Sequence, residues 1–448
     1  MTVARSRHET PSGLTTKRRD MRRRAHTIST VLAATALVLA ACGGDDETGA
    51  DPGAGDGDGE QSEEPIVVGS TLSLTGDFGP TAIIHRIVGE QFVEQLNENG
   101  GLLGRQVEWQ VLDDESDSAQ VTPLYERLIN QEQVDLILGP YATPNIIPAV
   151  AVAERAGYAI PHHTAIHAPL LGYECQFPGW SMDPEPDVFT SELLFEMLST
   201  LPDPPETIAL VTNESGSTLP MTEGFAEQGG GGGMLGIAPD YGLEVVAELA
   251  YPPGNQDWGS IATQLRDADA DVVINNGVAV DPVGIIEAMA QLNYQPPMLF
   301  SLFPAPGPLL EMGPPAEGTL SVSLFEPNKA LIDQYGEEVS GIVQEYRQRA
   351  EAEGLPYTAF ETQAAASWNT WEILTGAVEG AGTVDQEEVC NYLAENGVDT
   401  TFNGHLEFDS ESNNFWETNV GLKQIQDGEW VMVWPEDRAA AEVAPPRN

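Results

Sequence analysis

Apolar residues are arranged along this chain in two alternating patterns, which predict strands and helices in turn. The continuous run Ile66–Leu72 is typical of a buried strand, and apolar side chains that recur every fourth residue from Ile84 to Leu96 predict a helix with one buried face. That helix is expected to end at Asn99-Gly-Gly101, because glycine readily adopts the positive φ with which helices commonly terminate. A strand followed by a helix in this way indicates an α/β fold.

The alternation continues to the C-terminal part of the chain. Further strands are predicted at 107–112, 135–139, 158–161, 207–212, 243–249, 271–275, 298–301, 319–324, 420–425 and 429–433, and further helices at 121–128, 145–156, 188–198, 258–267, 282–292, 339–353, 362–378 and 385–395. The proline-rich stretch Pro178–Pro186 interrupts the pattern, and Gly229–Gly233 is expected to be a surface loop. The pattern therefore predicts two α/β lobes, built from parallel strands wound by helices.

One strand-to-helix turn is a candidate ligand site. The apolar run Leu136–Gly139 leads through Pro140 to Thr143, and a helix is expected to begin near Asn145. Such a turn directs backbone N–H groups and the threonine hydroxyl at one point, which suits a carboxylate or another electron-rich group of a small ligand. The same pattern also occurs at junctions that bind nothing, so its neighbours must decide between the two interpretations.

The composition is strongly acidic. The 448 residues include 70 acidic and 19 basic side chains, for a formal net charge of −51. Eight of the basic residues precede Ala25, so the chain from Cys42 onward has 68 acidic and 11 basic residues. This excess excludes nucleic acid as a partner, and it excludes a basic patch that would bind anionic lipid. We interpret the acidic, lysine-poor surface as an adaptation to salty or alkaline surroundings.

The N-terminal segment is typical of an export signal. Arg22–Arg24 form a basic region, and Thr30–Ala41 form an apolar region too short to span a bilayer. The closing Leu39-Ala-Ala-Cys42 resembles a bacterial lipobox, which implies a lipid on Cys42 and a protein anchored at the outer face of the cell membrane. An ordinary signal peptide with a chance cysteine is the alternative. Residues 43–64 are mostly Gly, Asp, Glu, Ala and Ser, a composition that predicts a flexible tether.

A series of short motifs follows the tether in a recognisable order. The motifs are Ile66-Val-Val-Gly69, Leu74-Thr-Gly76, Asn97-Glu-Asn-Gly-Gly-Leu-Leu-Gly-Arg105, Asp113-Asp114 with Asp117, Gly139-Pro140, and Ala153-Glu-Arg-Ala-Gly157 leading to Pro161. This order resembles that of the type I periplasmic binding proteins, in particular the lipoprotein form of the branched-chain amino acid (leucine/isoleucine/valine) receptors of ABC importers. The resemblance implies two Rossmann-like lobes joined by a hinge, with a ligand cleft between them that closes on binding.

The resemblance also implies a division of the chain in which each lobe is discontinuous. The expected parts are a signal peptide with an upstream extension (1–41), a lipidated tether (42–64), the first lobe (65–184 and 328–400), the second lobe (185–327), and terminal strands and tail that complete the hinge and the second lobe (401–448).

The same resemblance places the ligand between the lobes. In the family, a hydroxyl and an amide after the third strand hold the ligand carboxylate, which here implies Thr143 with Ala142 beside it; a second hydroxyl corresponds best to Thr164. Ser217 and Val278 stand where the amino-acid receptors use aromatic residues. The full set of predicted ligand-binding residues is Phe78, Thr81, Ala142, Thr143, His163, Thr164, Ser217, Val278 and Phe303.

The position of Phe303 departs from the family pattern. The amino-acid receptors hold an acidic residue there, in the loop after the strand 298–301, and it pairs with the ligand ammonium. Burying an unpaired ammonium costs several kcal/mol, so its replacement argues against an ordinary α-amino acid. Glu311 is a candidate stand-in that lies further along the loop. We therefore expect a ligand that is amino-acid-like or another small carboxylate or amide, and an uncharged or anionic, partly apolar molecule suits the cleft better than an ordinary α-amino acid.

Two other polar clusters could suggest metal or cation sites, but we prefer explanations that involve no ion. His162, His163 and His167 could bind zinc only if their loop folded back on itself, so no metal is predicted, and His163 is expected to face the cleft as a hydrogen-bond donor. The carboxylates of 113–117 are interpreted as caps of the following helix.

Cysteine usage leaves one question open. Cys175 and Cys390 are the only thiols besides Cys42. In an oxidising exterior two leftover cysteines can pair, but the sequence alone does not place them within reach of each other.

The leading functional hypothesis is a lipid-anchored receptor that delivers a small molecule to the membrane subunits of an ABC importer, without enzymatic activity or cofactor. No nucleophile elbow, phosphate-binding loop or paired-cysteine metal motif is found in the sequence. A sensory receptor of the same fold that signals ligand state to a partner is one alternative, and an exported metal hydrolase that uses the His162 cluster is another.

Overall fold

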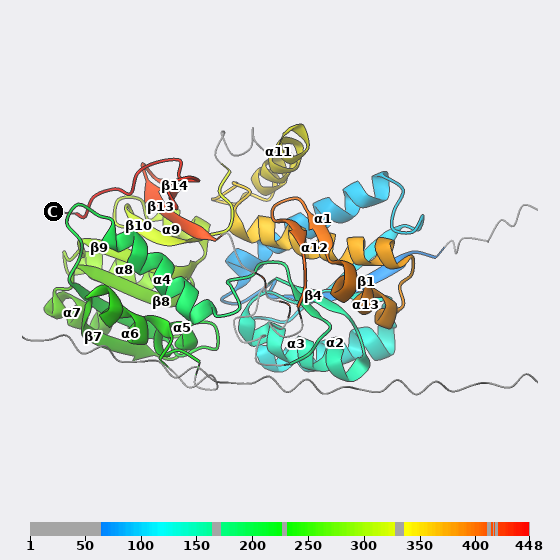
Figure 1. The fold of residues 1–448 in the computed structure, drawn as a ribbon, viewed down its shortest axis with the longest axis horizontal. Coiled ribbons are helices and arrows are strands. Elements are labelled where there is room, and N and C mark those ends of the chain that lie inside the picture. Colours follow the sequence, from blue (N-terminus) through cyan, green and yellow to red (C-terminus); the bar gives the residue numbers. More distant parts are fainter. Residues whose placement is uncertain are drawn as a thin grey trace, which may run out of the picture. The chain divides into compact units, whose positions relative to one another are not determined.

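The computed structural model describes residues 64–163, 172–225, 231–327, 336–409, 414, 416 and 420–447, all within one compact unit (Figure 1). These residues form two groups of strands, each covered by helices, which we call the first and the second lobe. The α/β fold class predicted from the apolar pattern is confirmed. Within the described ranges, no helix combines the length and the apolar character that crossing a bilayer requires.

The first lobe is built on parallel strands. β1 (Ile66–Leu72) lies between β2 (Val107–Asp113) and β3 (Leu136–Ile137). The regular part of β3 is short, but the backbone N–H of Gly139 donates to the carbonyl of Pro161 at 2.8 Å. This bond connects β3 to β4 (Ile160–His162), which pairs in parallel with β5 (Gln176–Pro178). The sequence did not predict β5, since three residues carry too little apolar pattern.

Helices from distant parts of the chain cover this lobe. They are α1 (Gly79–Glu98), α2 (Ser118–Arg127) with a π-helical turn (Leu128–Glu132), α3 (Thr143–Ala156), α11 (Glu337–Ala352), α12 (Thr362–Ala381) and α13 (Gln386–Asn396), and the small hairpin β11 (Val398–Thr400) and β12 (Gly404–Leu406) follows. Figure 1 shows the blue α1 beside the yellow-to-orange α12, and α1 also packs against α11. The late helices thus complete the core around β1.

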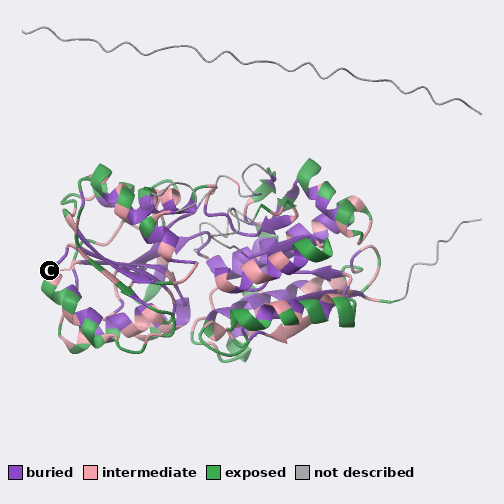
Figure 2. Ribbon diagram, turned by 90° about the horizontal axis from the view of Figure 1, so that it is seen from below, coloured by how far each residue is buried: buried purple, intermediate pink, exposed green. Residues whose placement is uncertain are grey.

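The second lobe contains one seven-stranded sheet in the order β14-β13-β10-β9-β8-β6-β7. Its strands are β6 (Thr207–Asn213), β7 (Glu244–Tyr251), β8 (Val272–Ala279), β9 (Met298–Pro304), β10 (Thr319–Ser323), β13 (Gly421–Gln426) and β14 (Glu429–Trp434). The first five are parallel, and the two last strands join antiparallel beside β10. Its helical segments are α4 (Pro186–Ser199), α5 (Leu219–Glu223), α6 (Gly233–Ile237), a 3-10 turn (Ala238–Tyr241), α7 (Gly259–Ala268), α8 (Asp281–Gln291) and α9 (Pro306–Glu311). Buried residues line the strands and the inner faces of the helices (Figure 2).

Two strands of this sheet extend further than predicted. β8 continues to Ala279, because the polar pair Asn275 and Asn276 is buried and hydrogen-bonded instead of marking a strand end; the Asn276 amide donates to Thr222 Oγ1 at 2.7 Å. β9 continues to Pro304, so Phe303 is a strand residue, and its placement in a loop was wrong.

Two smaller predictions also need correction. The helix expected near Asn145 begins at Thr143. Gly233 is not part of a surface loop, since it is buried and begins α6; residues 226–230 lie outside the described part of the chain.

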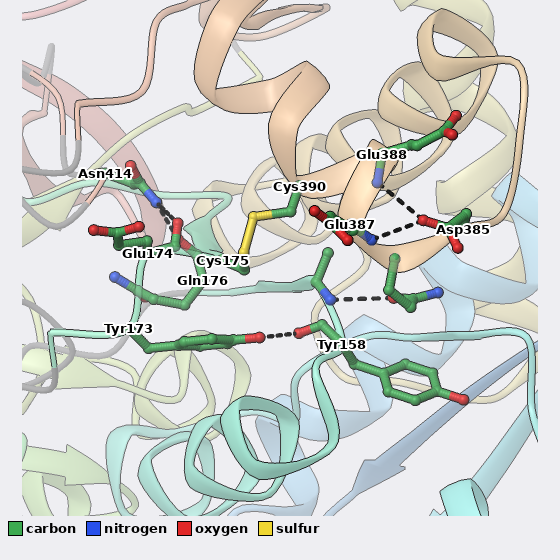
Figure 3. Close-up of a disulfide and its surroundings, with 12 residues drawn as sticks. Tyr158, Tyr173, Glu174, Cys175, Gln176, Asp385, Glu387, Glu388, Cys390 and Asn414 are labelled. Carbon is green, nitrogen blue, oxygen red and sulfur yellow. Dashed lines mark hydrogen bonds between the residues drawn. A yellow bond between two sulfur atoms is a disulfide. The ribbon is translucent and has the colours of Figure 1, made fainter. Parts of the chain in front are cut away.

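The structure joins Cys175, which precedes β5, to Cys390 in α13 by a disulfide with a Cα–Cα distance of 5.4 Å (Figure 3). The bond links positions separated by 215 residues. It therefore connects the early and the late chain segments that share the first lobe. The boundaries proposed for the lobes remain predictions.

Candidate ligand-binding cleft

Polar residues lock the carboxyl edge of the first sheet. The buried Asp114 accepts hydrogen bonds from the hydroxyls of Thr71 at 2.8 Å and Ser73 at 2.6 Å, and Ser73 in turn accepts from the Asn145 amide at 3.3 Å. Burial, first of all, raises the pKa of Asp114 above its ordinary value. The expectation that Asp114 caps the next helix is wrong, because its oxygens bind the loop after β1.

The neighbouring carboxylates divide between two roles. Asp113 accepts from the Thr75 hydroxyl at 2.8 Å, so it braces the same loop and does not cap a helix. Asp117 does cap α2, since it accepts from the backbone N–H of Ala119 at 2.9 Å. The loop that they hold ends at Phe78, whose backbone N–H donates to Ser116 Oγ at 3.1 Å.

The turn between β3 and α3 forms the next part of the site. Gly139 lies against the Cβ of His162, which leaves no room for a side chain at that position. Ala142 adopts a positive φ of 70°, which is uncommon outside glycine, and Thr143 follows as the first residue of α3. Tyr141 stacks on His85 with a centroid distance of 4.9 Å, and burial raises its pKa to about 12.

The two consecutive histidines at the end of β4, His162 and His163, have different surroundings. His162 pairs with Gln176 Oε1 inside the first lobe, and burial lowers its pKa to about 4. His163 packs edge-on against His85 at 4.6 Å between centroids. Burial, together with His85 and His162, lowers the pKa of His163 well below its ordinary value, so the ring is neutral near pH 7. Burial likewise lowers the pKa of His85 to about 3.

No metal centre emerges among these groups. Within the described ranges, no three His, Cys, Asp or Glu side chains are grouped so that they could hold an ion, and His167 lies outside those ranges.

The second lobe contributes residues from the ends of adjacent strands. β8 and β9 pair so that Val278 lies directly opposite Phe303. A bulge between Asn275 and Val278 shifts the register just before this pair. Ser217 comes from the loop after β6, where the Thr218 hydroxyl donates to the carbonyl of Asn213. Val278 and Phe303 lie at the carboxyl ends of their parallel strands, and Ser217 lies just beyond such an end. Open α/β sheets commonly bind ligands there.

Residues of both lobes meet around one small cavity. The centre of a water-sized sphere can move through about 40 Å³ of it. Its lining residues are Phe78, Tyr141, Ala142, Thr143, His163, Trp180, Ser217, Val278, Phe303 and Gln363.

Seven of the nine residues predicted from the sequence are in that lining. Of the other two, Thr81 is buried in α1 outside the lining, and Thr164 lies outside the described residues. The sequence analysis missed Tyr141, Trp180 and Gln363. Tyr141 sits inside the turn that was singled out, whereas the other two carried no local signal, because only folding brings them to the cleft.

Five aromatic rings succeed one another around this cavity, and we call them the ring wall: Phe78, Tyr141, His163, Trp180 and Phe303. Neighbouring centroids in this order are 5.6 to 6.3 Å apart, and the interplanar angles lie between 79° and 88°. Each ring is thus nearly perpendicular to the next, so both ring edges and ring faces are presented within a short distance.

A wider groove adjoins the cavity, and Phe78 and Val278 line both. The centre of a water-sized sphere can move through about 900 Å³ of the groove. Five carboxylates line it and no basic side chain does: Asp77, Asp117, Asp257, Asp281 and Glu287. Burial is the main cause that raises the pKa of Asp281, and Asp77 contributes to the increase.

Neither Glu311, the stand-in considered for an ammonium partner, nor the groove carboxylate Asp281 lines the cavity. Glu311, at the end of α9, is exposed and lines neither the cavity nor the groove. Asp281 lines the groove, but one of its oxygens already accepts from Asn213, Tyr251 and the backbone N–H of Val278 at 2.7 to 3.2 Å.

A buried charge cluster positions Gln363. Glu361 caps α12 by accepting from the backbone N–H of Gln363 at 2.9 Å. The Lys423 ammonium in β13 donates to Glu326, which follows β10, at 2.6 Å and to Glu361 at 3.4 Å. Because Glu326 and Lys423 belong to segments around the second sheet and Glu361 begins a helix of the first lobe, the cluster ties the two lobes together beside the cavity.

Two groups of mainly parallel strands, and a cavity lined by residues of both lobes, define a two-lobed ligand-binding protein. Residues 65–429 match the family described as "Periplasmic binding protein", so the chain belongs to this family, as its motifs predicted.

Sequence relatives point in the same direction. A "Leu/Ile/Val-binding protein homolog 8" of Brucella abortus is 25% identical over 236 residues, which cover 51% of this chain and 54% of that protein. The chain thus spans about half the length of this relative. A "Leucine-, isoleucine-, valine-, threonine-, and alanine-binding protein" of Pseudomonas aeruginosa is 22% identical over 349 residues, with 75% of this chain and 84% of that protein covered.

Solved structures share the fold. The branched-chain amino acid transporter substrate-binding protein LivJ of Streptococcus pneumoniae, in complex with isoleucine, has a TM-score of 0.66 at 20% identity and covers 86% of this chain and 100% of its own. A solute-binding protein of an ABC transporter from R. palustris, in complex with benzoate, has a TM-score of 0.65 at 17% identity and covers 86% of this chain and 98% of its own.

Proposed function

We propose that this chain is a solute receptor that captures a small organic molecule in the cavity between its lobes and hands it to the membrane subunits of an ABC importer. The observation that carries the proposal is the cavity itself, because lining residues from both lobes converge on it. A ligand held there would bridge the lobes and favour a closed arrangement, which is how a binding event becomes readable to a partner.

The cavity lining favours a ligand that is at least partly apolar. None of its ten residues is Asp, Glu, Lys or Arg, and four of them are Phe, Tyr or Trp. An isolated anion would leave water for a site without a basic residue, past a groove lined by carboxylates, and that transfer is unfavourable. Leucine or valine would lack the carboxylate that their ammonium needs. Two sequence relatives and one structural relative are named for such amino acids, so leucine, isoleucine and valine are the reference compounds with which other ligands should be compared.

The lipid anchor on Cys42 and the outer face of the cell membrane are part of the same proposal. The lipobox-like Leu39-Ala-Ala-Cys42 supports them. Metabolic labelling with a radioactive fatty acid should mark the wild-type protein and not Cys42→Ala, and label on the variant would refute lipidation at this residue.

An unbiased ligand screen tests the receptor function. The purified protein is heated in the presence of amino acids, amides, aromatic acids, short-chain carboxylates and methylated amines, and material that co-purifies is released by denaturation and identified by mass spectrometry. A bound ligand stabilises the folded protein by mass action and so raises its unfolding temperature. At a ligand concentration of about one hundred times Kd, the free energy of unfolding increases by about 2.7 kcal/mol. Trp180→Ala should abolish the shift. If no compound and no co-purified molecule binds, the receptor function is wrong.

Transport and sensing are then separated in cells. Deleting the partner importer should stop uptake of the identified ligand if the chain serves transport. Unchanged uptake together with a lost transcriptional response in a strain without this chain would favour the sensory alternative.

A further inference from the structure

The ring wall poses a chemical question that the receptor function leaves open. It surrounds a cavity in which no side chain carries a formal charge near pH 7, since His163 is held neutral by burial. Such a wall is suited to any apolar group, so hydrophobicity alone does not identify the ligand. The nearly perpendicular succession of rings adds information, because it borders the cavity with aromatic rings in several orientations.

Primary ammonium groups do not suit this cavity. An –NH3+ group brings three N–H donors that must be satisfied when water is removed. The lining offers no carboxylate. A cation without N–H groups has no such requirement, and it is stabilised by the faces of aromatic rings.

Free anions do not suit the site either. The adjoining groove carries five carboxylates and no basic residue beside Phe78 and Val278, so an anion near the cavity would lie in a negative field. The acidity of the groove follows the composition of the whole chain, but its effect on an ion is the same whatever its origin. It attracts cations and repels anions over the range of a Debye length, about 8 Å at physiological ionic strength.

We propose that the cleft of this receptor binds a small quaternary ammonium compound, a trimethylated nitrogen that carries a short arm ending in oxygen. The proposal rests on the receptor function proposed above and specifies its ligand. The ring wall holds the methylated nitrogen by cation–π contact, and it needs no acidic partner because the nitrogen carries no hydrogen.

The size of the cavity fits such a head group. A water molecule requires about 10–15 Å³ of the same kind of space, so 40 Å³ accommodates about three to four water-sized positions. A trimethylammonium group has four heavy atoms in a compact, nearly spherical arrangement.

The structure also offers a partner for the oxygen of the arm. Trp180 Nε1 is buried, and it has no hydrogen-bond partner among the described residues. A buried N–H that remains unpaired is unfavourable, so a ligand oxygen that accepts from it would be favoured. Gln363, held by the Glu361 cap, provides an amide at the same cavity.

Matched pairs of probes test the proposal on the purified full-length protein. Choline is compared with 3,3-dimethylbutan-1-ol, and glycine betaine with 3,3-dimethylbutyrate; within each pair a carbon replaces the nitrogen and removes the positive charge at constant shape. Isothermal titration should show choline binding roughly tenfold or more tightly than its uncharged carbon analogue, which corresponds to a cation–π contribution of about 1.4 kcal/mol; the betaine pair, a zwitterion against an anion, should show the same preference. Equal or tighter binding of the carbon analogues, or no binding of either quaternary ammonium compound, overturns the proposal.

Substitutions locate the effect. Trp180→Leu and Phe303→Leu should each weaken binding of the cation by roughly fivefold to thirtyfold while changing binding of the carbon analogue much less. Phe195→Leu removes a fully buried ring in α4, outside the cavity lining, and should leave affinity unchanged. If the two cavity variants weaken both members of a pair equally, the wall acts only as an apolar surface and the proposal is wrong.

The groove provides an independent readout. Asp77→Asn and Asp257→Asn neutralise exposed groove carboxylates and should slow association of the cation at low salt, whereas Asp203→Asn, which precedes the opposite end of β6, should not. Failure of the ligand class is distinguishable from failure of the receptor function. Leucine, an amide or an aromatic acid that stabilises the protein while both cations fail to bind refutes the former and supports the latter.

Discussion

A single buried lysine, Lys423, pairs with two carboxylates where the lobes meet. Its removal should lower the stability of the folded protein by an unusually large amount. The side chains of Lys423, Glu326 and Glu361 are 5%, 2% and 1% exposed. Methionine has a similar length and apolar stem, so Lys423→Met removes chiefly the charge. Breaking a buried ion pair by removing one partner typically costs about 3–5 kcal/mol, because the remaining charge stays buried without compensation. Here two carboxylates remain, so we expect the upper part of that range.

The pH dependence of the loss identifies its cause. Burial raises the pKa of Glu361 to about 7 even with Lys423 beside it, and loss of the ammonium raises that pKa further. A raised carboxyl pKa means that the folded protein binds a proton which the unfolded protein, with an ordinary pKa near 4.5, does not bind. The contribution of this group to stability is therefore present below pH 4.5 and is lost as the pH rises through the folded pKa.

The variant should consequently be most destabilised in alkaline solution. Between pH 7 and 8 folded wild-type Glu361 gives up most of its proton while the variant carboxyl keeps its proton, so the variant loses up to about 1.4 kcal/mol more stability per pH unit than the wild type. Urea unfolding followed by tryptophan fluorescence at pH 6, 7 and 8 measures the difference.

Two controls make the result interpretable. Lys423→Arg keeps the charge and should lose much less. The triple variant Glu326→Gln, Glu361→Gln, Lys423→Met removes every charge of the cluster and should recover most of the stability, since replacing a complete buried ion pair is often nearly neutral. The reasoning is refuted if Lys423→Met costs less than about 1 kcal/mol at pH 8, or if the triple variant is as unstable as the single one.

Three further predictions address other parts of the fold. Removing the disulfide with Cys175→Ser should destabilise the protein by up to about 5 kcal/mol, the chain-entropy value for a loop of 215 residues, and reductant should have the same effect on the wild type alone; urea unfolding with and without dithiothreitol measures both. In α1, Gly89→Ala places a Cβ against the Trp109 ring of β2 and should lower the stability of the protein by about 1–3 kcal/mol. In α11, the Cβ added by Gly341→Ala meets no atom within 4 Å, so this substitution should raise the stability by about 0.5–1 kcal/mol. Thermal unfolding measures both changes. Because the pKa of His163 is lowered by burial, the unfolded chain takes up a proton there below pH 6.5 that the folded chain does not, so wild-type stability should fall on acidification and His163→Phe should reduce that slope by up to about 1.4 kcal/mol per pH unit in urea titrations at pH 5 and 6.5.

Each of these has an outcome that would contradict it. Equal stability of Cys175→Ser and wild type would mean that the bond does not constrain the unfolded chain. Equal effects of the two glycine substitutions would show that helix propensity outweighs the packing against Trp109. An unchanged acid slope in His163→Phe would mean that this imidazole is protonated in the folded protein.

Local sequence was sufficient for much of the architecture. The apolar run Ile66–Leu72 and the four-residue spacing from Ile84 to Leu96 predicted β1 and α1, because strand and helix periodicities are properties of consecutive residues. The Gly139-Pro140 turn predicted the start of α3 within two residues. The strand-to-helix pattern pointed to Thr143, and the resemblance to the type I periplasmic binding proteins implied Phe78 and Phe303; all three line the cavity.

The tertiary structure decided what shares the cavity. Trp180 follows the three-residue strand β5, which the apolar pattern did not predict. Gln363 lies at the cavity because Glu361, which caps α12, is held by the buried Lys423 from the last part of the chain. The length of β8 depended on whether buried asparagines find partners in another helix, and that is a question of packing at long range. The chain by itself thus determined which segments are strands and helices and where polar turns interrupt them. Whether five rings from five such segments face one another, and whether Cys175 reaches Cys390, was set by how the lobes pack, because contacts between distant residues have no signature in local periodicity.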